Sequence, residues 1–307
     1  MKFRDDLELR RRVAEEAARA GGAVHRKYRG QELARTIHDG ERADYATQVD
    51  FEAQEAVREV VTRHFPHERV IGEEDESFDD IAEEMERGCW FTDPLDGTQE
   101  FVHGAPGYSC IVVYVEHGAP QACAAYFDAW GEMFSAADGL GATLNGAPIR
   151  VSGQQELSGA VFSTAYRGTE VAKAQGFAAR FVKLVPHVEG FRMPGAPSVM
   201  ACGVAAGRYD LYVYLSARLE PPPARPFVGQ PWETAAFILL VREAGGAVQP
   251  LRGEGDYDVL GHNIYAASPR RGWTAPPASR TSKMKAAVSH GCPTKGRAGG
   301  GSSRAER

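Results

Sequence analysis

The segment of the sequence with the most evident chemistry is residues 90–98, Trp-Phe-Thr-Asp-Pro-Leu-Asp-Gly-Thr. An apolar run leads there into two carboxylates, Asp93 and Asp96. Because Pro94 restricts the preceding residue to extended conformations, the turn can direct both carboxylates and the Leu95 carbonyl towards one point. Hard divalent cations prefer such oxygen ligands, so this segment predicts a metal site.

A glycine and a threonine follow these acids and extend the prediction from a metal to a phosphate. Gly97 allows the backbone to approach a ligand closely. A short helix beginning at Thr98 would present free N–H groups to a phosphate. Taken alone, the same sequence is also consistent with an ordinary Asp-Pro turn whose acids are solvated.

Three further acids lie at the ends of predicted elements. Glu73 follows an apolar pair, Val70-Ile71, that indicates a short strand ending in acidic residues. Asp50 falls in the first turn of one predicted helix and Glu233 at the start of another. Each of these acids alone is also consistent with a surface charge or a partner for a helix N-terminus, and the functional interpretation depends on their combination.

Charge and composition exclude several classes of protein. The 307-residue chain is 43% apolar and 25% charged, with a net charge of −6, an ordinary balance for a globular protein. Eight Lys/Arg and one Glu lie from residue 271 onward, so the preceding part carries 27 basic and 40 acidic residues. That acidic body is a poor surface for nucleic acid, and it would need cations to accept an anionic substrate.

Other features of the sequence argue against export and membranes. No apolar run reaches the ~20 residues of a membrane helix, and the charged start does not resemble a signal peptide. The five scattered cysteines are typical of reduced thiols rather than of a disulfide framework. We therefore expect a cytoplasmic protein that binds neither membranes nor nucleic acid.

Hydrophobic periodicity predicts amphipathic helices over residues 5–28 and 48–64. His25, Arg26 and Lys27 would place positive charge at the end of the first helix, where the helix dipole favours it. Further helices are predicted over residues 78–87, 170–184, 199–206 and 232–244. Strands are predicted over residues 70–71, 89–92, 108–115, 121–127, 133–136, 149–151, 160–165, 209–214 and 264–267. Such alternation is typical of layered α/β packing.

Five ordered motifs resemble those of the inositol monophosphatase family, beginning with the Asp-Pro-Leu-Asp-Gly-Thr signature at residues 93–98. The others are residues 46–50 (Ala-Thr-Gln-Val-Asp), 72–74 (Gly-Glu-Glu), 231–236 (Pro-Trp-Glu-Thr-Ala-Ala) and 243–246 (Glu-Ala-Gly-Gly). The resemblance spans about residues 5–270. It implies the family's layered α-β-α-β-α sandwich, of the kind shared with fructose bisphosphatases.

The resemblance also implies a cofactor, two or three Mg²⁺ ions per site, and ligands for them. Glu73, Asp93 and the Leu95 carbonyl match the residues that hold one ion. Asp93, Asp96 and Glu233 match those that hold a second, and a third, weaker ion lies near Glu73. Such ions would neutralise a phosphate monoester and generate the attacking hydroxide.

The remaining roles come from the same resemblance. Thr98 would hydrogen-bond the attacking water, and Asp50, itself also a candidate metal ligand, would orient Thr98 or accept its proton. Glu73 completes the set of candidate catalytic residues. The backbone N–H groups of Gly97 and Thr98 would hold the phosphate. The segment matching the family's sugar-lining or inositol-lining residues contributes Arg192, Gly195, Ala196 and Pro197 as substrate-binding candidates.

The sequence departs from the family pattern in the residues that would bind the alcohol part of the phosphate monoester. Glu233 stands where most members carry Asp, and its extra methylene moves the carboxylate by roughly 1.5 Å. Pro197 replaces a small residue and lacks an N–H. Residues 216–231, with five prolines, form a predicted loop that we expect to cap the pocket. Because of these departures, myo-inositol 1-phosphate is not fixed as the substrate.

We therefore expect hydrolysis of a cyclitol or sugar phosphate, with histidinol phosphate and 3′-phosphoadenosine 5′-phosphate as alternatives. A catalytically weak phosphate-binding protein is the alternative of another class, and a homodimer is left open. The expected domains are an N-terminal α+β lobe (1–152), a C-terminal α/β lobe (153–270) and a disordered basic tail (271–307). That tail offers a further alternative, binding to nucleic acid, which the acidic body opposes.

Overall fold

The computed structural model describes residues 2–37, 45–75, 78, 80–165, 171–213, 231–250 and 264–267. The Pro-rich segment before Pro231 and the basic tail, with the roles predicted for them, lie outside the described residues.

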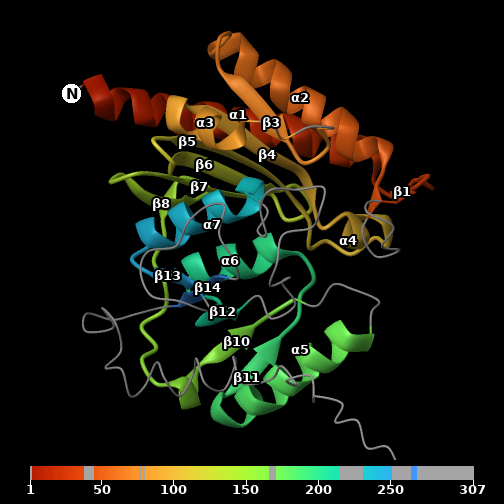
Figure 1. Ribbon diagram of the computed structural model, residues 1–307, viewed down its shortest axis with the longest axis vertical. Helices are drawn as coiled ribbons and strands as arrows, with labels where there is room; N and C mark the ends of the chain where they lie inside the picture. Colours follow the sequence, from red (N-terminus) through yellow and green to blue (C-terminus); the bar gives the residue numbers. More distant parts are fainter. Residues whose placement is uncertain are drawn as a thin grey trace, which may run out of the picture.

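Layers of helix and sheet alternate through the molecule (Figure 1). Helices α1 (Lys2–Tyr28) and α2 (Gln48–His64) cover the outer face of the larger sheet. Helices α6 (Pro197–Ala205) and α7 (Pro231–Glu243) separate this sheet from a smaller one, and α5 (Val171–Leu184) lies beyond the smaller sheet. This arrangement confirms the predicted α-β-α-β-α sandwich.

Seven described strands form the larger sheet in sequence order, β3-β4-β5-β6-β7-β8-β9. Their bounds are Arg69–Gly72, Cys89–Asp96, Ser109–Glu116, Ala119–Phe127, Glu132–Ala137, Gly141–Leu144 and Ala147–Pro148. The pair β3 and β4 is parallel and the other neighbours are antiparallel. A short crossover helix, α3 (Ile81–Arg87), precedes β4, and α4 (Thr98–Val102) follows it.

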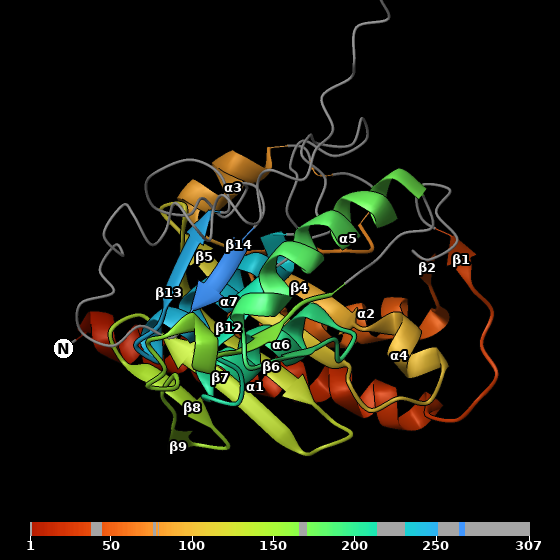
Figure 2. The ribbon, with the colours of Figure 1, turned by 90° about the horizontal axis from the view of Figure 1, so that it is seen from below.

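The smaller sheet has the order β11-β10-β12-β14-β13 in the part of the chain that is described. Its strands are β10 (Val161–Ser163), β11 (Gly190–Arg192), β12 (Leu211–Val213), β13 (Ala247–Pro250) and β14 (Ile264–Ala267). Helix α5 packs against this sheet through a cluster that includes Leu184, Phe162 and Leu211. Figure 2 shows the ribbon of α5 from below. The remaining described elements are a two-stranded ribbon, β1 (Thr36–Ile37) with β2 (Tyr45–Ala46), and the 3₁₀ turns Leu157–Gly159 and Val185–His187.

Helix α1 approaches the sheet closely because it presents glycine there. A Cβ at Gly21 would lie 2.5 Å from the Cys110 Sγ, and one at Gly22 would lie 2.6 Å from the Tyr126 ring. Such distances are too short for any side chain. The glycines therefore cost helix propensity but allow α1 to pack directly on β5 and β6.

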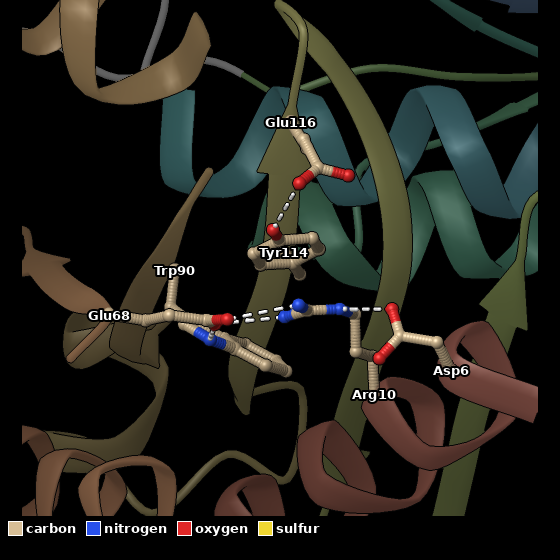
Figure 3. Close-up of polar contacts among 6 residues, drawn as sticks. All are labelled: Asp6, Arg10, Glu68, Trp90, Tyr114 and Glu116. Carbon is tan, nitrogen blue, oxygen red and sulfur yellow. Dashed lines mark hydrogen bonds and ion pairs between the residues drawn. The ribbon is translucent and has the colours of Figure 1, made fainter. Parts of the chain in front are cut away.

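A polar cluster fixes the other end of α1 to the sheet (Figure 3). Arg10 forms two hydrogen bonds, of 2.8 and 2.9 Å, with the Glu68 carboxylate, and its guanidinium lies 3.6 Å from the centre of the Tyr114 ring. Asp6 accepts a third bond from Arg10, and the Trp90 indole donates to Glu68. Because Arg10 is largely buried, this cluster sets the position of α1 over β3, β4 and β5.

The central helices are buried almost all round. Every residue of α6 is buried, as are the residues of α7 from Pro231 to Val241. A helix covered by sheets on both sides needs such an apolar surface. The charged exception at the start of α7 is Glu233, which is 8% exposed.

Several local predictions were wrong or incomplete. The expected strand at 149–151 is displaced to β9, Ala147–Pro148. Strands β1, β2, β8, β11 and β13 were not predicted, because short strands between turns carry little periodicity. The four described cysteines, Cys89, Cys110, Cys123 and Cys202, are free, as expected for reduced thiols. Among the described residues, no helix is long and apolar enough to cross a membrane.

Candidate metal centre

Asp93 and Asp96 lie on either side of a β-bulge in β4. Asp93 pairs with Ile111 of β5 and Asp96 with Ser109, so one extra residue is inserted in β4. In a regular strand, side chains alternate between the faces, and residues at positions i and i+3 would point to opposite sides. The extra residue returns both carboxylates to the face that packs on α6 and α7. Pro94 fits this bulge because it has no N–H to pair.

Glu233 brings a third carboxylate to this face from the first turn of α7. Ligand oxygens of Asp93, Asp96 and Glu233 all lie within 4.8 Å of one another. The longer Glu side chain therefore reaches the aspartates, although the family pattern has Asp at this position. All three carboxylates are buried.

The electrostatics of this group require a positive partner. Burial raises the pKa of Asp93 well above its usual range, and the negative charges of Glu73, Asp96 and Glu233 raise it further. Three buried carboxylates are costly to keep ionised together. A divalent cation would remove that cost, and an all-oxygen donor set suits Mg²⁺. The residues present therefore fit the ion that the sequence implies.

Asp50 and Thr98, which the family resemblance pairs, lie within hydrogen-bonding distance of each other beside this group. The Thr98 hydroxyl lies 3.0 Å from Asp50 Oδ1 and 3.1 Å from the Leu95 carbonyl oxygen. The other Asp50 oxygen accepts two bonds of 2.7 Å from the backbone and hydroxyl of Thr47, which caps α2. Burial, with a smaller contribution from the charge of Glu74, raises the pKa of Asp50 to about 7.

Glu73 lies in the turn after β3, next to β4. Its backbone N–H donates to the Thr92 carbonyl at 3.1 Å. In the described part of the chain it is not a member of the group of three carboxylates. Its charge is nevertheless the largest electrostatic contribution to the raised pKa of Asp93, which indicates that it lies close by.

Helix α2 holds the Glu73 turn through two residues that the sequence did not single out. Gln54 accepts from the Glu74 N–H at 3.1 Å and donates to Asp75 at 3.0 Å. Arg58 forms a 2.9 Å bond with the same Asp75 carboxylate. Together with Asp50, these side chains recur every four residues and occupy one face of α2. That spacing was visible in the sequence, but their partners were not.

The predicted substrate-side segment packs against the turn after β4. A Cβ at Gly97, whose φ is +95°, would lie 2.9 Å from the Ala196 Cβ. Gly195 has a φ of +108°, which side chains rarely adopt, and a Cβ there would also meet the Glu100 carboxylate in α4. Residues 195–196 therefore lie directly on the glycine-threonine turn, and only glycine fits at these two contacts.

The start of α6 turns towards the aspartates. Pro197 is its first residue, where a missing N–H is tolerated, and the Ser198 N–H donates to Asp96 Oδ2 at 2.7 Å. Arg192 differs from its neighbours in the predicted set. It is exposed on β11, its guanidinium donates to the Phe191 carbonyl at 2.8 Å, and no contact among the described residues joins it to the carboxylates.

His25 lies in a different environment from the one that the sequence predicted. It was expected to add positive charge at the end of α1, but its ring is fully buried and its Nε2 lies 2.8 Å from the Pro94 carbonyl oxygen. Burial lowers the pKa of His25 to about 4, so the ring is neutral at neutral pH. This contact depends on the packing of α1 against β4, which the sequence alone does not show.

The chain is a layered α-β-α-β-α protein with a group of buried carboxylates between its larger sheet and its central helices. The profile of the inositol monophosphatase family matches residues 6–285. The chain belongs to the inositol monophosphatase family.

Individual relatives agree with this assignment. The chain is 32% identical to a Vibrio cholerae protein named Nus factor SuhB, over 83% of this chain and 89% of that protein. It is 31% identical to inositol monophosphatase 3 of Solanum lycopersicum, over 83% of this chain and 91% of that protein. Among solved structures, the Thermotoga maritima IMPase superposes with a TM-score of 0.72 at 25% identity, covering 94% of this chain and 98% of that one.

Proposed function

We propose that this protein is a Mg²⁺-dependent phosphatase that hydrolyses a small phosphate monoester. The observation that carries the proposal is the group of three buried carboxylates from β4 and α7, with ligand oxygens within 4.8 Å of one another. A buried acidic group of this kind is unfavourable without a cation. Its position beside the Asp50–Thr98 pair supports a catalytic rather than a purely structural ion.

The chain offers enough oxygen ligands for two or three ions. Asp93, Asp96 and Glu233 would hold one, and Glu73, Asp93 and the Leu95 carbonyl would hold another. When bound, Mg²⁺ supplies neutralisation of the phosphate and a lowered pKa for the attacking water. Asp50, which is buried next to this centre, can support the same ions through its charge.

Thr98, Asp50 and Gly97 would orient the attacking water and bind the phosphate. Thr98 has one hydroxyl hydrogen and two acceptors in reach, Asp50 and the Leu95 carbonyl. Donation to Asp50 leaves the Thr98 oxygen free to accept a hydrogen bond from a water and aim it at phosphorus. As the water gives a proton to the Thr98 oxygen, the Thr98 hydroxyl proton would pass to Asp50. The N–H groups of Gly97 and Thr98 would hold the phosphate oxygens, with attack in line and no covalent phosphoenzyme.

The alcohol part of the substrate would lie against residues 195–197, of which Ala196 packs on Gly97. A cyclitol or sugar phosphate fits this proposal, with histidinol phosphate and 3′-phosphoadenosine 5′-phosphate as alternatives. Phosphate release from a panel of these monoesters, with Mg²⁺ and with or without Li⁺, tests the activity and ranks the substrates. We expect release from at least one of them that depends on Mg²⁺.

A catalytically weak, phosphate-binding role is the second candidate, and the name Nus factor carried by the Vibrio cholerae relative is the reason to test it. The same panel separates the two candidates. Binding of inorganic phosphate with Mg²⁺, without turnover of any monoester, would favour the second candidate over the first.

A further inference from the structure

His25 contacts strand β4 next to the candidate metal centre, from the opposite side of the larger sheet. It lies near the end of α1, whereas the three carboxylates face α6 and α7. Its Nε2 lies 2.8 Å from the carbonyl oxygen of Pro94, the residue between the aspartates where the bulge interrupts pairing with β5. Because a carbonyl oxygen can only accept, Nε2 must carry the hydrogen of this bond.

The imidazole ring makes no other hydrogen bond to the residues that the structure describes. Its Nδ1 is buried and has no hydrogen-bond partner among the described residues. The ring packs against the aromatic rings of Phe101 and Tyr108, with centroids 5.9 and 5.6 Å away. A buried polar atom without a partner costs roughly 1–3 kcal/mol. The histidine at this position therefore carries the cost of a buried Nδ1 without a partner. Its polar contact among the described residues is the bond from Nε2 to the Pro94 carbonyl.

That contact continues through one peptide unit to a predicted metal ligand. The Pro94 carbonyl and the Leu95 N–H belong to the same planar peptide, and in a trans peptide they point in opposite directions. The Leu95 N–H donates to Asp93 Oδ1 at 3.0 Å. Fixing the carbonyl from the α1 side therefore fixes the N–H that orients the Asp93 carboxylate on the other side.

We propose that His25 is a positioning residue for the metal centre, which aligns Asp93 by holding the Pro94–Leu95 peptide in one orientation. The proposal rests on the proposed function only in that Asp93 is a metal ligand. Residues that orient ligands from outside the coordination shell commonly contribute 10–100-fold in metal affinity. The His25 ring acts on Asp93 through the Pro94–Leu95 peptide rather than by contacting the Asp93 side chain itself.

Two amide variants separate hydrogen bonding from packing. In His25→Gln the amide nitrogen occupies a place similar to Nε2 and can still donate to Pro94. In His25→Asn the amide is polar but too short to reach. Leu7→Ala is the matched control, since Leu7 is a buried residue of the same helix that packs against Ala122 and Ala137.

Mg²⁺ binding to the full-length proteins, measured by titration calorimetry without substrate, provides the test. We expect His25→Asn to weaken Mg²⁺ binding about 10–100-fold, and His25→Gln and Leu7→Ala to bind like the unsubstituted protein. If His25→Asn does not fold, His25→Met, which fills the space without a donor, replaces it.

Unchanged Mg²⁺ affinity in His25→Asn, or equal losses in His25→Asn and His25→Gln, would overturn the proposal. Phosphate release by the unsubstituted protein is measured separately. Weakened Mg²⁺ binding in His25→Asn with no phosphatase activity in any protein would support the positioning role and refute the phosphatase function alone.

Discussion

The carboxylates of Asp93 and Glu233 lie within 4.8 Å of each other, in a group completed by Asp96. One comes from a strand of the larger sheet and the other from the helix that separates the two sheets. Folding therefore brings like charges together in a buried place, where their repulsion opposes stability until a cation binds.

Asp93→Asn should stabilise the metal-free protein and remove its response to Mg²⁺. The amide oxygen can still accept from the Leu95 N–H, but the charge that Glu73, Asp96 and Glu233 repel is gone. We expect the unfolding midpoint in EDTA to rise by a few degrees, since ~1 kcal/mol corresponds to roughly 2–4 °C in a chain of this size. A lower midpoint in EDTA, together with a retained shift on adding Mg²⁺, would contradict this account.

Acidification should weaken Mg²⁺ binding while it stabilises the metal-free fold. The folded-state pKa of Asp50 is raised to about 7 and that of Asp93 is raised as well. The folded protein therefore holds protons that the unfolded chain has lost, and stability from this source increases as the pH falls towards the unfolded values. The same protons compete with the cation. The rise in unfolding midpoint on adding Mg²⁺ should be larger at pH 8 than at pH 6, and the reverse order would be inconsistent with this centre.

Thr98→Val should reduce turnover far more than it reduces Mg²⁺ affinity. Valine keeps the shape of the side chain but removes the hydroxyl that lies 3.0 Å from Asp50. Loss of a positioned proton-transfer group typically costs 10²–10⁴-fold in rate, and we expect a fall of about that size in kcat. Thr98→Ser retains the hydroxyl and is the control. Unchanged activity in both variants would exclude the Thr98 hydroxyl from the reaction.

Arg10→Met should destabilise the protein without changing its activity. The Arg10 side chain is 9% exposed and Glu68 is 22% exposed, so removing Arg10 leaves a partly buried carboxylate without its cation. Breaking a buried ion pair costs ~3–5 kcal/mol, and we expect roughly 3 kcal/mol because Glu68 retains some solvent. Arg12→Met, on an exposed position of α1, should change the free energy of unfolding by less than about 0.5 kcal/mol. Similar urea unfolding curves for both variants would show that the cluster contributes little.

The layered fold and the two aspartates of β4 were predictable from the sequence because their signals are local. Apolar periodicity marks α1 and α2, and the acids stand together around Pro94. The β-bulge was not predictable. It depends on which residues of β5 face Asp93 and Asp96, and the register of a sheet is determined by contacts between distant segments.

The supporting residues were hidden for the same reason. His25 had the sequence context of a charge at a helix end, and its burial follows only from the packing of α1 under β4. Gln54 and Arg58 stand in a helical repeat with Asp50, but nothing local indicates that they bind the turn of residues 72–75. The sequence also did not show whether the longer Glu233 side chain could join the aspartates. The position of α7 compensates for its additional methylene.

The most direct test of the account is Mg²⁺-dependent phosphate release by the full-length protein and by Glu233→Ala, with Arg242→Ala as an exposed control on the same helix. We expect the unsubstituted protein and Arg242→Ala to release phosphate from a small monoester with Mg²⁺ and not with EDTA. Glu233→Ala should lose at least ~100-fold in rate, the upper end of what a residue outside the coordination shell contributes. Mg²⁺-independent release, or near-normal release by Glu233→Ala, would contradict the proposed metal centre.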